Sequence, residues 1–213
     1  MMRRSILAHR GLWEQDAEKN MLASLARAVR SGYGIETDVR DCRGQLVIAH
    51  DMPVGIEVAF ADIVRLCAET RVPLAINVKA DGLAVAIGDV LHRHPDLDAF
   101  CFDMSVPELF RYQMQGLPTF TRVSEFETAP VLYDKAEGVW LDAFDSDWYA
   151  PDLIKRFIGN GKRVAVVSPE LHHRQCQDLW ASLLSAGLGG SLDDLLLCTD
   201  YPEAAVAFFG DKA

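Results

Sequence analysis

The chain lacks long apolar runs, an excess of positive charge and paired cysteines, and each absence excludes a class of protein. No apolar run approaches the ~20 residues that span a bilayer, so we expect no stable membrane insertion. The formal net charge of -10 argues against nucleic acid or an anionic membrane as a partner, because both favour clustered lysine and arginine. A small anionic substrate in a local basic pocket is compatible with this charge.

The five cysteines are scattered, odd in number and without a C-x-x-C pair. This pattern favours free thiols in a reducing cytosol over a disulfide framework or a zinc site. The apolar stretch Ser5–Ala8 is too short for a signal peptide, so we expect a cytoplasmic protein. No linker, repeat or low-complexity tract divides the 213 residues, which predicts one domain spanning 1–213.

Short apolar runs alternate along the chain with longer amphipathic stretches. The runs expected to be buried strands are Ser5–Ala8, Gly34–Val39, Leu74–Val78, Ala99–Phe102, Thr119–Thr121, Gly138–Leu141, Arg163–Val167 and Leu195–Cys198. The expected helices are Met21–Arg30, Ile56–Thr70, Leu83–Arg93, Pro107–Gln115, Thr128–Ala136, Pro151–Ile158, Pro169–Ser185 and Pro202–Phe209. Eight such units predict a single (β/α)8 TIM barrel with short loops, and an open doubly wound sheet is the alternative.

Local signals refine two of these helices and add a strand. Asn20 is a candidate N-cap for the first helix, and Ser124 with Glu127 has capping-box spacing before the fifth. A short run, Leu46–Ala49, is expected to pair with the second strand as a hairpin through Asp41–Gly44.

Polar residues at the ends of barrel strands are informative, because active sites of such barrels lie at the carboxyl ends of the strands. Glu36 and Asp38 are two residues apart in a strand, so their side chains share one face. Two neighbouring carboxylates repel unless a divalent cation such as Mg2+ or Ca2+ joins them. The alternative is that they pair with Arg10, Lys79 or Arg122.

Two histidines, His9 and His50, also follow strands at this rim. Because histidine titrates near neutral pH, one can take a proton from a nucleophile while the other gives one to a leaving oxygen. Arg10, Lys79 and Arg122 supply positive charge suited to a phosphate. The remaining histidines, His92, His94, His172 and His173, fall on expected helices and are interpreted as solvated or half-buried surface groups.

At these residues the sequence resembles the glycerophosphodiester phosphodiesterase family, whose members are (β/α)8 barrels. The matching segments are Leu7-Ala8-His9-Arg10-Gly11, Gly34-Ile35-Glu36-Thr37-Asp38-Val39 and Val47-Ile48-Ala49-His50-Asp51, with weaker matches at Val78-Lys79, Phe102-Asp103 and Thr199-Asp200-Tyr201-Pro202. The resemblance implies that His9 and His50 are the acid–base pair, that Glu36 and Asp38 are metal ligands, and that Arg10 and Lys79 contact phosphate.

The sequence departs from the family pattern at two places. The third metal carboxylate of the family is replaced by Asn77, whose amide oxygen can bind Mg2+ or Ca2+ without adding charge. Asp142, or else Glu170, is a positional candidate for the missing carboxylate. The long insertion that covers the family's site after His-Asp is absent, so a substrate bulkier than glycerophosphocholine is compatible with this chain.

Three hypotheses follow. The first, which we favour, is a metal-dependent hydrolase acting on a small glycerol- or polyol-type phosphodiester. The second is a related phospholipase-type lyase that forms a cyclic phosphate by attack of the substrate's own hydroxyl. The third is a catalytically weak barrel that binds a phosphorylated ligand.

Overall fold

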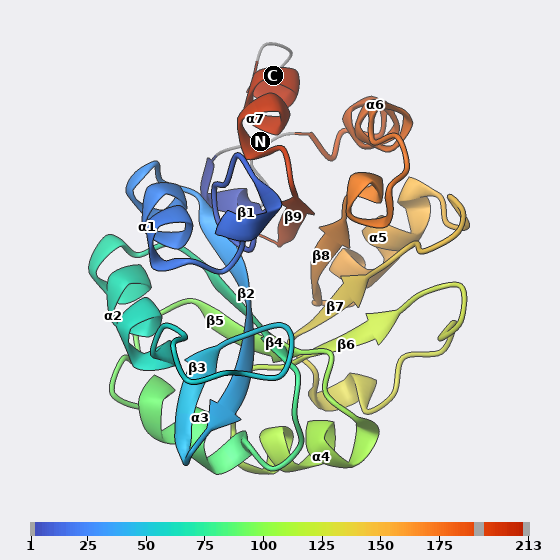
Figure 1. Ribbon diagram of the computed structural model, residues 1–213. Coiled ribbons are helices and arrows are strands. Elements are labelled where there is room, and N and C mark those ends of the chain that lie inside the picture. The colour runs from blue at the N-terminus through green and yellow to red at the C-terminus, as the bar shows by residue number, and fades with distance from the viewer. Residues whose placement is uncertain (1–2, 190–193, 211–213) are drawn as a thin grey trace.

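The computed structural model describes residues 3–189 and 194–210, and the predicted domain span of 1–213 extends over residues outside these ranges. In the described part, eight parallel strands surround a central axis (Figure 1). They are β1 (Ile6–His9), β2 (Gly34–Cys42), β4 (Leu74–Val78), β5 (Ala99–Phe102), β6 (Phe120–Val123), β7 (Gly138–Leu141), β8 (Arg163–Val167) and β9 (Leu195–Thr199). All eight predicted strands are thereby confirmed, with ends shifted by up to three residues.

The strand order is β5-β4-β2-β1-β9-β8-β7-β6, and the two outer strands approach each other. A single parallel bridge, Cys101 to Thr119, joins them, with the amide of Cys101 donating to the carbonyl of Pro118 at 2.9 Å. The barrel is therefore nearly closed, which confirms the predicted barrel and excludes an open doubly wound sheet. The hairpin strand β3 (Gln45–Ile48) pairs antiparallel with β2, as expected.

Seven α-helices surround the strands in the described residues (Figure 1). They are α1 (Leu22–Arg30), α2 (Phe60–Thr70), α3 (Ala84–Leu91), α4 (Val106–Met114), α5 (Pro151–Gly159), α6 (Gln177–Ser185) and α7 (Pro202–Gly210). Four short 3-10 helices are η1 (Arg3–Ser5), η2 (Asp16–Glu18), η3 (Tyr133–Lys135) and η4 (Pro169–His172). In the part of the chain that the structure describes, no helix combines the length and apolar character needed to cross a bilayer.

The predicted helix Thr128–Ala136 is wrong, because this segment contains only η3. Ser124 does accept the amide of Glu127 at 3.2 Å, so the capping contact forms. Pro130 then disfavours helical backbone at the residue before it, and Leu132 takes a left-handed φ of 51°. A capping contact alone therefore does not propagate a helix here.

Successive side chains of each strand point alternately into the barrel and outward toward the helices, so the buried apolar residues form two separate clusters. The inner side chains form a cluster of Leu7, Ala75, Phe100, Phe102, Phe120, Trp140, Ala165, Val167, Leu196 and Cys198. Phe100 stacks on Phe120 and Phe102 on Trp140, each with ring centroids 3.7 Å apart. These rings fill the barrel axis. Polar side chains that share the inner face, such as Glu36 and Asn77, therefore lie where the packed interior gives way to a cavity.

Candidate active site

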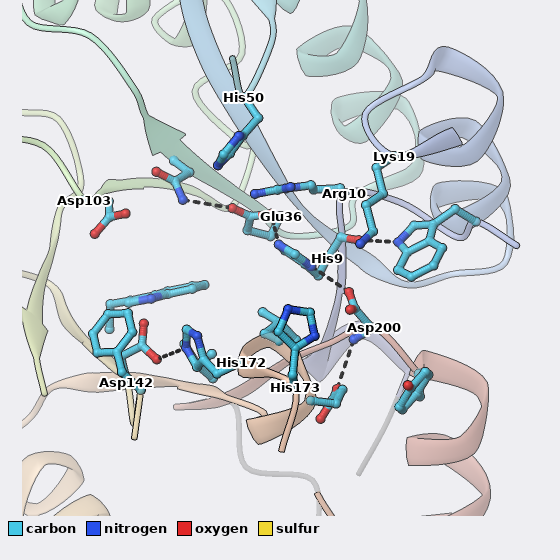
Figure 2. Close-up of a pocket in the computed structure, with 18 of the residues that line it drawn as sticks. His9, Arg10, Lys19, Glu36, His50, Asp103, Asp142, His172, His173 and Asp200 are labelled. Carbon is cyan, nitrogen blue, oxygen red and sulfur yellow. Dashed lines mark hydrogen bonds and ion pairs between the residues drawn. The ribbon is translucent and has the colours of Figure 1, made fainter. Parts of the chain in front are cut away.

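A cavity of about 590 Å³ lies where the carboxyl ends of the strands meet (Figure 2). Its lining residues are His9, Arg10, Trp13, Asp16, Lys19, Glu36, His50, Asn77, Lys79, Asp103, Arg122, Trp140, Asp142, Phe144, Val167, Glu170, Leu171, His172, His173, Asp200 and Tyr201. Eight of the nine predicted site residues are among them. Asp38, the ninth, is fully buried behind the lining, in contact with Arg10 and Lys79.

The backbone after β1 explains why glycine follows His9 and Arg10. Arg10 and Gly11 have left-handed φ values of 56° and 97°. A Cβ on Gly11 would lie 2.7 Å from the backbone carbon of Ser24, so the turn packs directly against α1. Glycine is the residue that accepts both constraints. The turn leaves His9 at the strand end and directs Arg10 toward Asp38.

His9 is oriented by Asp200, at the end of β9. Its Nδ1 lies 2.6 Å from Oδ1 of Asp200, and its Nε2 lies 3.8 Å from Oε2 of Glu36. Since an ionised carboxylate only accepts hydrogen bonds, Nδ1 carries the proton and Nε2 is left as the free nitrogen on the Glu36 side. Asp200 belongs to one of the weaker family matches in the sequence, but its pairing with His9 was missed, because 191 residues separate the two.

Glu170 positions Asp200 by accepting a hydrogen bond from its backbone amide. Its Oε1 accepts the backbone amide of Asp200 at 3.1 Å and the hydroxyl of Thr199, and its Oε2 accepts the hydroxyl of Ser168. Both carboxylate oxygens are therefore engaged. The structure gives no support to Glu170 as the missing metal carboxylate.

Glu36 is a buried carboxylate at the base of the cavity. The amide nitrogen of Asn77 donates to its Oε1 at 3.2 Å. Burial is the main cause that raises the pKa of Glu36, and the neighbouring Asp38 carboxylate raises it further, against the opposing effect of His9, Arg10 and Lys79.

Asp38 is held by cations and an amide, as the alternative interpretation expected. Its Oδ2 lies 2.9 Å from Nε of Arg10 and accepts the amide of Asn20 at 2.8 Å, while its Oδ1 lies 3.4 Å from Nζ of Lys79. Asn20 also accepts the hydroxyl of Thr37. The prediction of Asn20 as an N-cap is wrong: it has a left-handed φ of 62°, and its side chain faces β2 instead of the start of α1.

Three buried acceptor oxygens at this place have no hydrogen-bond donor: Oε2 of Glu36, Oδ1 of Asp38 and Oδ1 of Asn77. Carboxylate and amide oxygens are the ligands that Mg2+ and Ca2+ prefer. These three residues therefore fit a divalent cation. Among the described residues no group of three or more His, Cys, Asp or Glu side chains is arranged to hold a metal ion, so the fit depends on the amide of Asn77.

His50 enters the cavity from the segment after β3 (Figure 2). Its Nδ1 lies 3.0 Å from Oδ1 of Asp51, and its side chain is 44% exposed. Asp51 is 95% exposed, so this pair is held far more loosely than His9 and Asp200. The two histidines nevertheless line one cavity, as predicted.

Lys79 and Arg122 are joined through Asp103. Nζ of Lys79 lies 3.7 Å from Asp103, and Nη1 of Arg122 lies 2.5 Å from it. Arg122 also pairs with Glu127. Of the three predicted phosphate contacts, Arg122 is therefore the one that lies closest to its acidic partners.

Asp142 pairs with His172 in a part of the cavity away from Glu36 and Arg10 (Figure 2). Its Oδ1 lies 2.7 Å from Nε2 of His172 and accepts the amide of Ala143 at 2.9 Å. No contact links Asp142 to Glu36 or Asp38 in the part of the chain described, so its predicted role as a metal ligand gains no support.

His172 and His173, interpreted as solvated or half-buried surface groups of a helix, are partly buried and exposed respectively, and both line the cavity. The predicted helix Pro169–Ser185 is two elements, η4 and α6, separated by His173 with a left-handed φ of 60°. The ring of His172 also packs against Phe144 with centroids 4.7 Å apart. Helical spacing of apolar residues did not reveal this break.

No family model and no curated protein sequence matches the chain. Several solved structures resemble it, among them three phosphodiesterases. A phosphodiesterase from Oleispira antarctica, in complex with the product sn-glycerol-3-phosphate, has a TM-score of 0.70 and 17% identity, covering 96% of both chains. A glycerophosphodiester phosphodiesterase from Agrobacterium tumefaciens has a TM-score of 0.68 and 16% identity, covering 95% of this chain and 98% of its own.

The third is a glycerophosphoryl diester phosphodiesterase from Parabacteroides distasonis, with a TM-score of 0.50 and 12% identity over 97% of this chain and 86% of its own. At these identities the likeness concerns the fold. The chain thus shares, along nearly its whole length, the α/β barrel of solved phosphodiesterases.

Proposed function

We propose that the chain is a phosphodiester hydrolase of the glycerophosphodiester phosphodiesterase type. The observation that carries this proposal is the convergence on one cavity of the His9–Asp200 pair, the Glu36 carboxylate, His50 and the cations Arg10 and Lys79. The shared barrel of three phosphodiesterases supports it, and the product bound to one of them suggests a glycerol phosphate ester as substrate.

Arg10 and Lys79 would bind the phosphate, since both present positive charge to the cavity. Glu36, Asp38 and Asn77 would hold Mg2+ or Ca2+, and this cation supplies neutralisation of charge on the phosphoryl oxygens when bound. His9 and His50 would share the proton transfers. The Nε2 of His9, with Nδ1 held by Asp200, is the nitrogen available to accept a proton, and either histidine suits either role.

The test is hydrolysis of bis(p-nitrophenyl) phosphate and glycerophosphocholine by the wild type, His9→Ala and His50→Ala. We expect kcat/KM to fall by about 10²- to 10⁴-fold in each variant, because proton transfer contributes this much to catalysis. His92→Ala is the matched control, since His92 lies on the exposed end of α3. Losses under about threefold in both variants would remove these histidines from the mechanism.

The end product separates the two catalytic hypotheses. A phosphomonoester indicates attack by water, whereas a cyclic phosphate indicates attack by the substrate's own hydroxyl. Calorimetry with Mg2+, Ca2+ and Mn2+ tests the cation. No cation binding together with no turnover would favour a barrel that only binds phosphorylated ligands.

We also propose a cytoplasmic location and no nucleic-acid partner. All five cysteines are free and four of them are buried, which supports a reducing compartment. The net charge of -10 supports the absence of a nucleic-acid partner.

A further inference from the structure

A second cavity, of about 570 Å³, adjoins the catalytic one. The two have Arg10, Asp16, Lys19 and His50 in common, so they open into each other around these side chains. The remaining lining residues of the second cavity are Asn20, Met21, Ile48, Ala49, Asp51, Val54, Ile56, Glu57 and Val58. Six of these nine are apolar. We call this second cavity the apolar groove.

Side chains along the apolar groove are exposed to an unusual degree. Ile56 is 89% exposed, Val54 is 74% and Met21 is 54%, and the adjacent Met52 is 78% exposed. Single exposed apolar residues are common on protein surfaces. Several within five residues, continuous with a charged cavity, are the pattern of a binding surface.

The segment that carries Val54 and Ile56 is held in shape by hydrogen bonds. The carboxylate of Glu57 accepts the backbone amide of Val54 and that of Gly55, the latter at 2.8 Å. At the end of the segment the amide of Ile48 donates to the carbonyl of Val58 at 2.8 Å. The exposed position of these side chains is therefore a defined feature of the fold.

Two positively charged side chains lie at the junction of the two cavities. Arg10 and Lys19 lie where the two meet, and Lys19 is paired with Asp16 at 2.9 Å and lies 4.2 Å from the centre of the Trp13 ring. Beyond them most of the groove lining is apolar, and Asn20, Asp51 and Glu57 are its polar members. A ligand that fits both cavities has an anionic phosphate at one end and a hydrocarbon chain at the other.

We propose that the apolar groove binds the acyl chain of a glycerophosphodiester that carries one fatty acid. This inference rests on the proposed function and names its substrate class. Water attacks the phosphorus, the P–O bond to the headgroup alcohol breaks, and the alcohol leaves with a proton from the water. The products are the free alcohol and an acylglycerol phosphate, and no further reactant is needed.

The test is a series of 1-acyl-glycerophosphocholines with acyl chains of two to eight carbons, assayed below their micelle concentrations. Because a fully buried methylene contributes ~0.8 kcal/mol, we expect kcat/KM to rise by about two- to fourfold for each methylene. Most of this rise should appear as a lower KM. A series in which kcat/KM does not change with chain length would overturn the proposal.

The variants Ile56→Asp and Val54→Asp test whether the dependence on chain length arises in the apolar groove. We expect both to abolish the dependence on chain length and to leave the turnover of glycerophosphocholine unchanged, because neither residue touches the phosphate site. Val85→Asp, on α3, is the matched control: Val85 is 60% exposed and does not line either cavity. A dependence on chain length that survives in Ile56→Asp would contradict the assignment.

A binding measurement keeps this test independent of catalysis. Calorimetry with hexyl-, octyl- and decylphosphocholine should show tighter binding with each methylene in the wild type but not in Ile56→Asp. If binding tightens with chain length but no substrate is turned over, the proposed hydrolase function is wrong, while the assignment of the apolar groove as an acyl-chain site is supported. If sedimentation instead shows a dimer that Ile56→Asp dissociates, the groove is an interface and the proposal is overturned.

Discussion

Asp200 is the residue whose role follows most directly from the geometry of His9. Its carboxylate keeps the proton on Nδ1 of His9 and leaves Nε2 free toward Glu36. In Asp200→Asn the amide can donate to Nδ1 and reverse the tautomer. We expect kcat on bis(p-nitrophenyl) phosphate to fall by about 10²- to 10⁴-fold.

The control for this variant is Asp178→Asn on the exposed face of α6, which should keep wild-type kcat. Circular dichroism checks that both variants fold. A kcat within threefold of the wild type in Asp200→Asn would show that Asp200 does not orient the catalytic imidazole.

Glu36 should make stability depend on pH. Because burial raises its pKa above the ordinary 4.5, its contribution to stability is fully present below pH 4.5 and is lost as the pH rises through the raised value. Glu36→Gln removes this loss. Without divalent cations, we expect the variant to be more stable than the wild type at pH 8 by about 0.5–2 kcal/mol.

Urea unfolding at pH 4 and pH 8, with chelator present, measures the effect, and the two proteins should converge at the lower pH. Glu69→Gln, on the exposed face of α2, should follow the wild type at both pH values. If Glu36→Gln is no more stable than the wild type at pH 8, the buried charge is balanced by its neighbours, and the inferred strain at the site is wrong.

At the scale of elements, the turn from β1 toward α1 depends on Gly11. With φ at 97° and a Cβ position 2.7 Å from the backbone of Ser24, alanine must distort the turn. We expect Gly11→Ala to lower the free energy of unfolding by about 1–3 kcal/mol and to reduce kcat by displacing His9.

Gly159→Ala is the matched control, since Gly159 lies in α5 with no atom within 4 Å of the added Cβ. There alanine should raise the free energy of unfolding by about 0.5 kcal/mol, as in other helices. Urea titration of both variants provides the comparison, and equal effects would mean that the turn tolerates a side chain.

Elements also show where prediction from sequence failed. The eight strands were recognisable because buried parallel strands are short continuous apolar runs. The two misassigned helices, Thr128–Ala136 and Pro169–Ser185, could not be recognised as non-helical from sequence. Both segments begin with helical signals, but each contains a residue with left-handed backbone, Leu132 in the first and His173 in the second. Backbone conformation at such positions depends on packing that a local pattern does not contain.

At the scale of the whole molecule, the barrel is stabilised by aromatic rings along its axis. Phe102 is fully buried and stacks on Trp140 beneath the cavity. Phe102→Ala should cost about 3–5 kcal/mol of unfolding free energy, because the ring is removed from a packed interior. Phe110→Ala, half exposed on α4, should change stability by less than ~0.5 kcal/mol.

Chemical denaturation measures both phenylalanine variants. A small loss in Phe102→Ala would indicate that neighbouring side chains collapse into the space. The rings would then contribute less to the closure of the barrel than their burial suggests.

The sequence by itself determined the barrel and eight of the residues that line the cavity. Strand periodicity placed Glu36 and Asp38 on one face, and the strand ends placed His9 and His50 at one opening, since these follow from local geometry. Tertiary structure alone decided the partners. The pairing of His9 with Asp200, of Asp38 with Arg10 and Asn20, and of Asp142 with His172 joins elements far apart in the chain. Such contacts depend on how the nearly closed barrel brings its strand ends together, which no local pattern encodes.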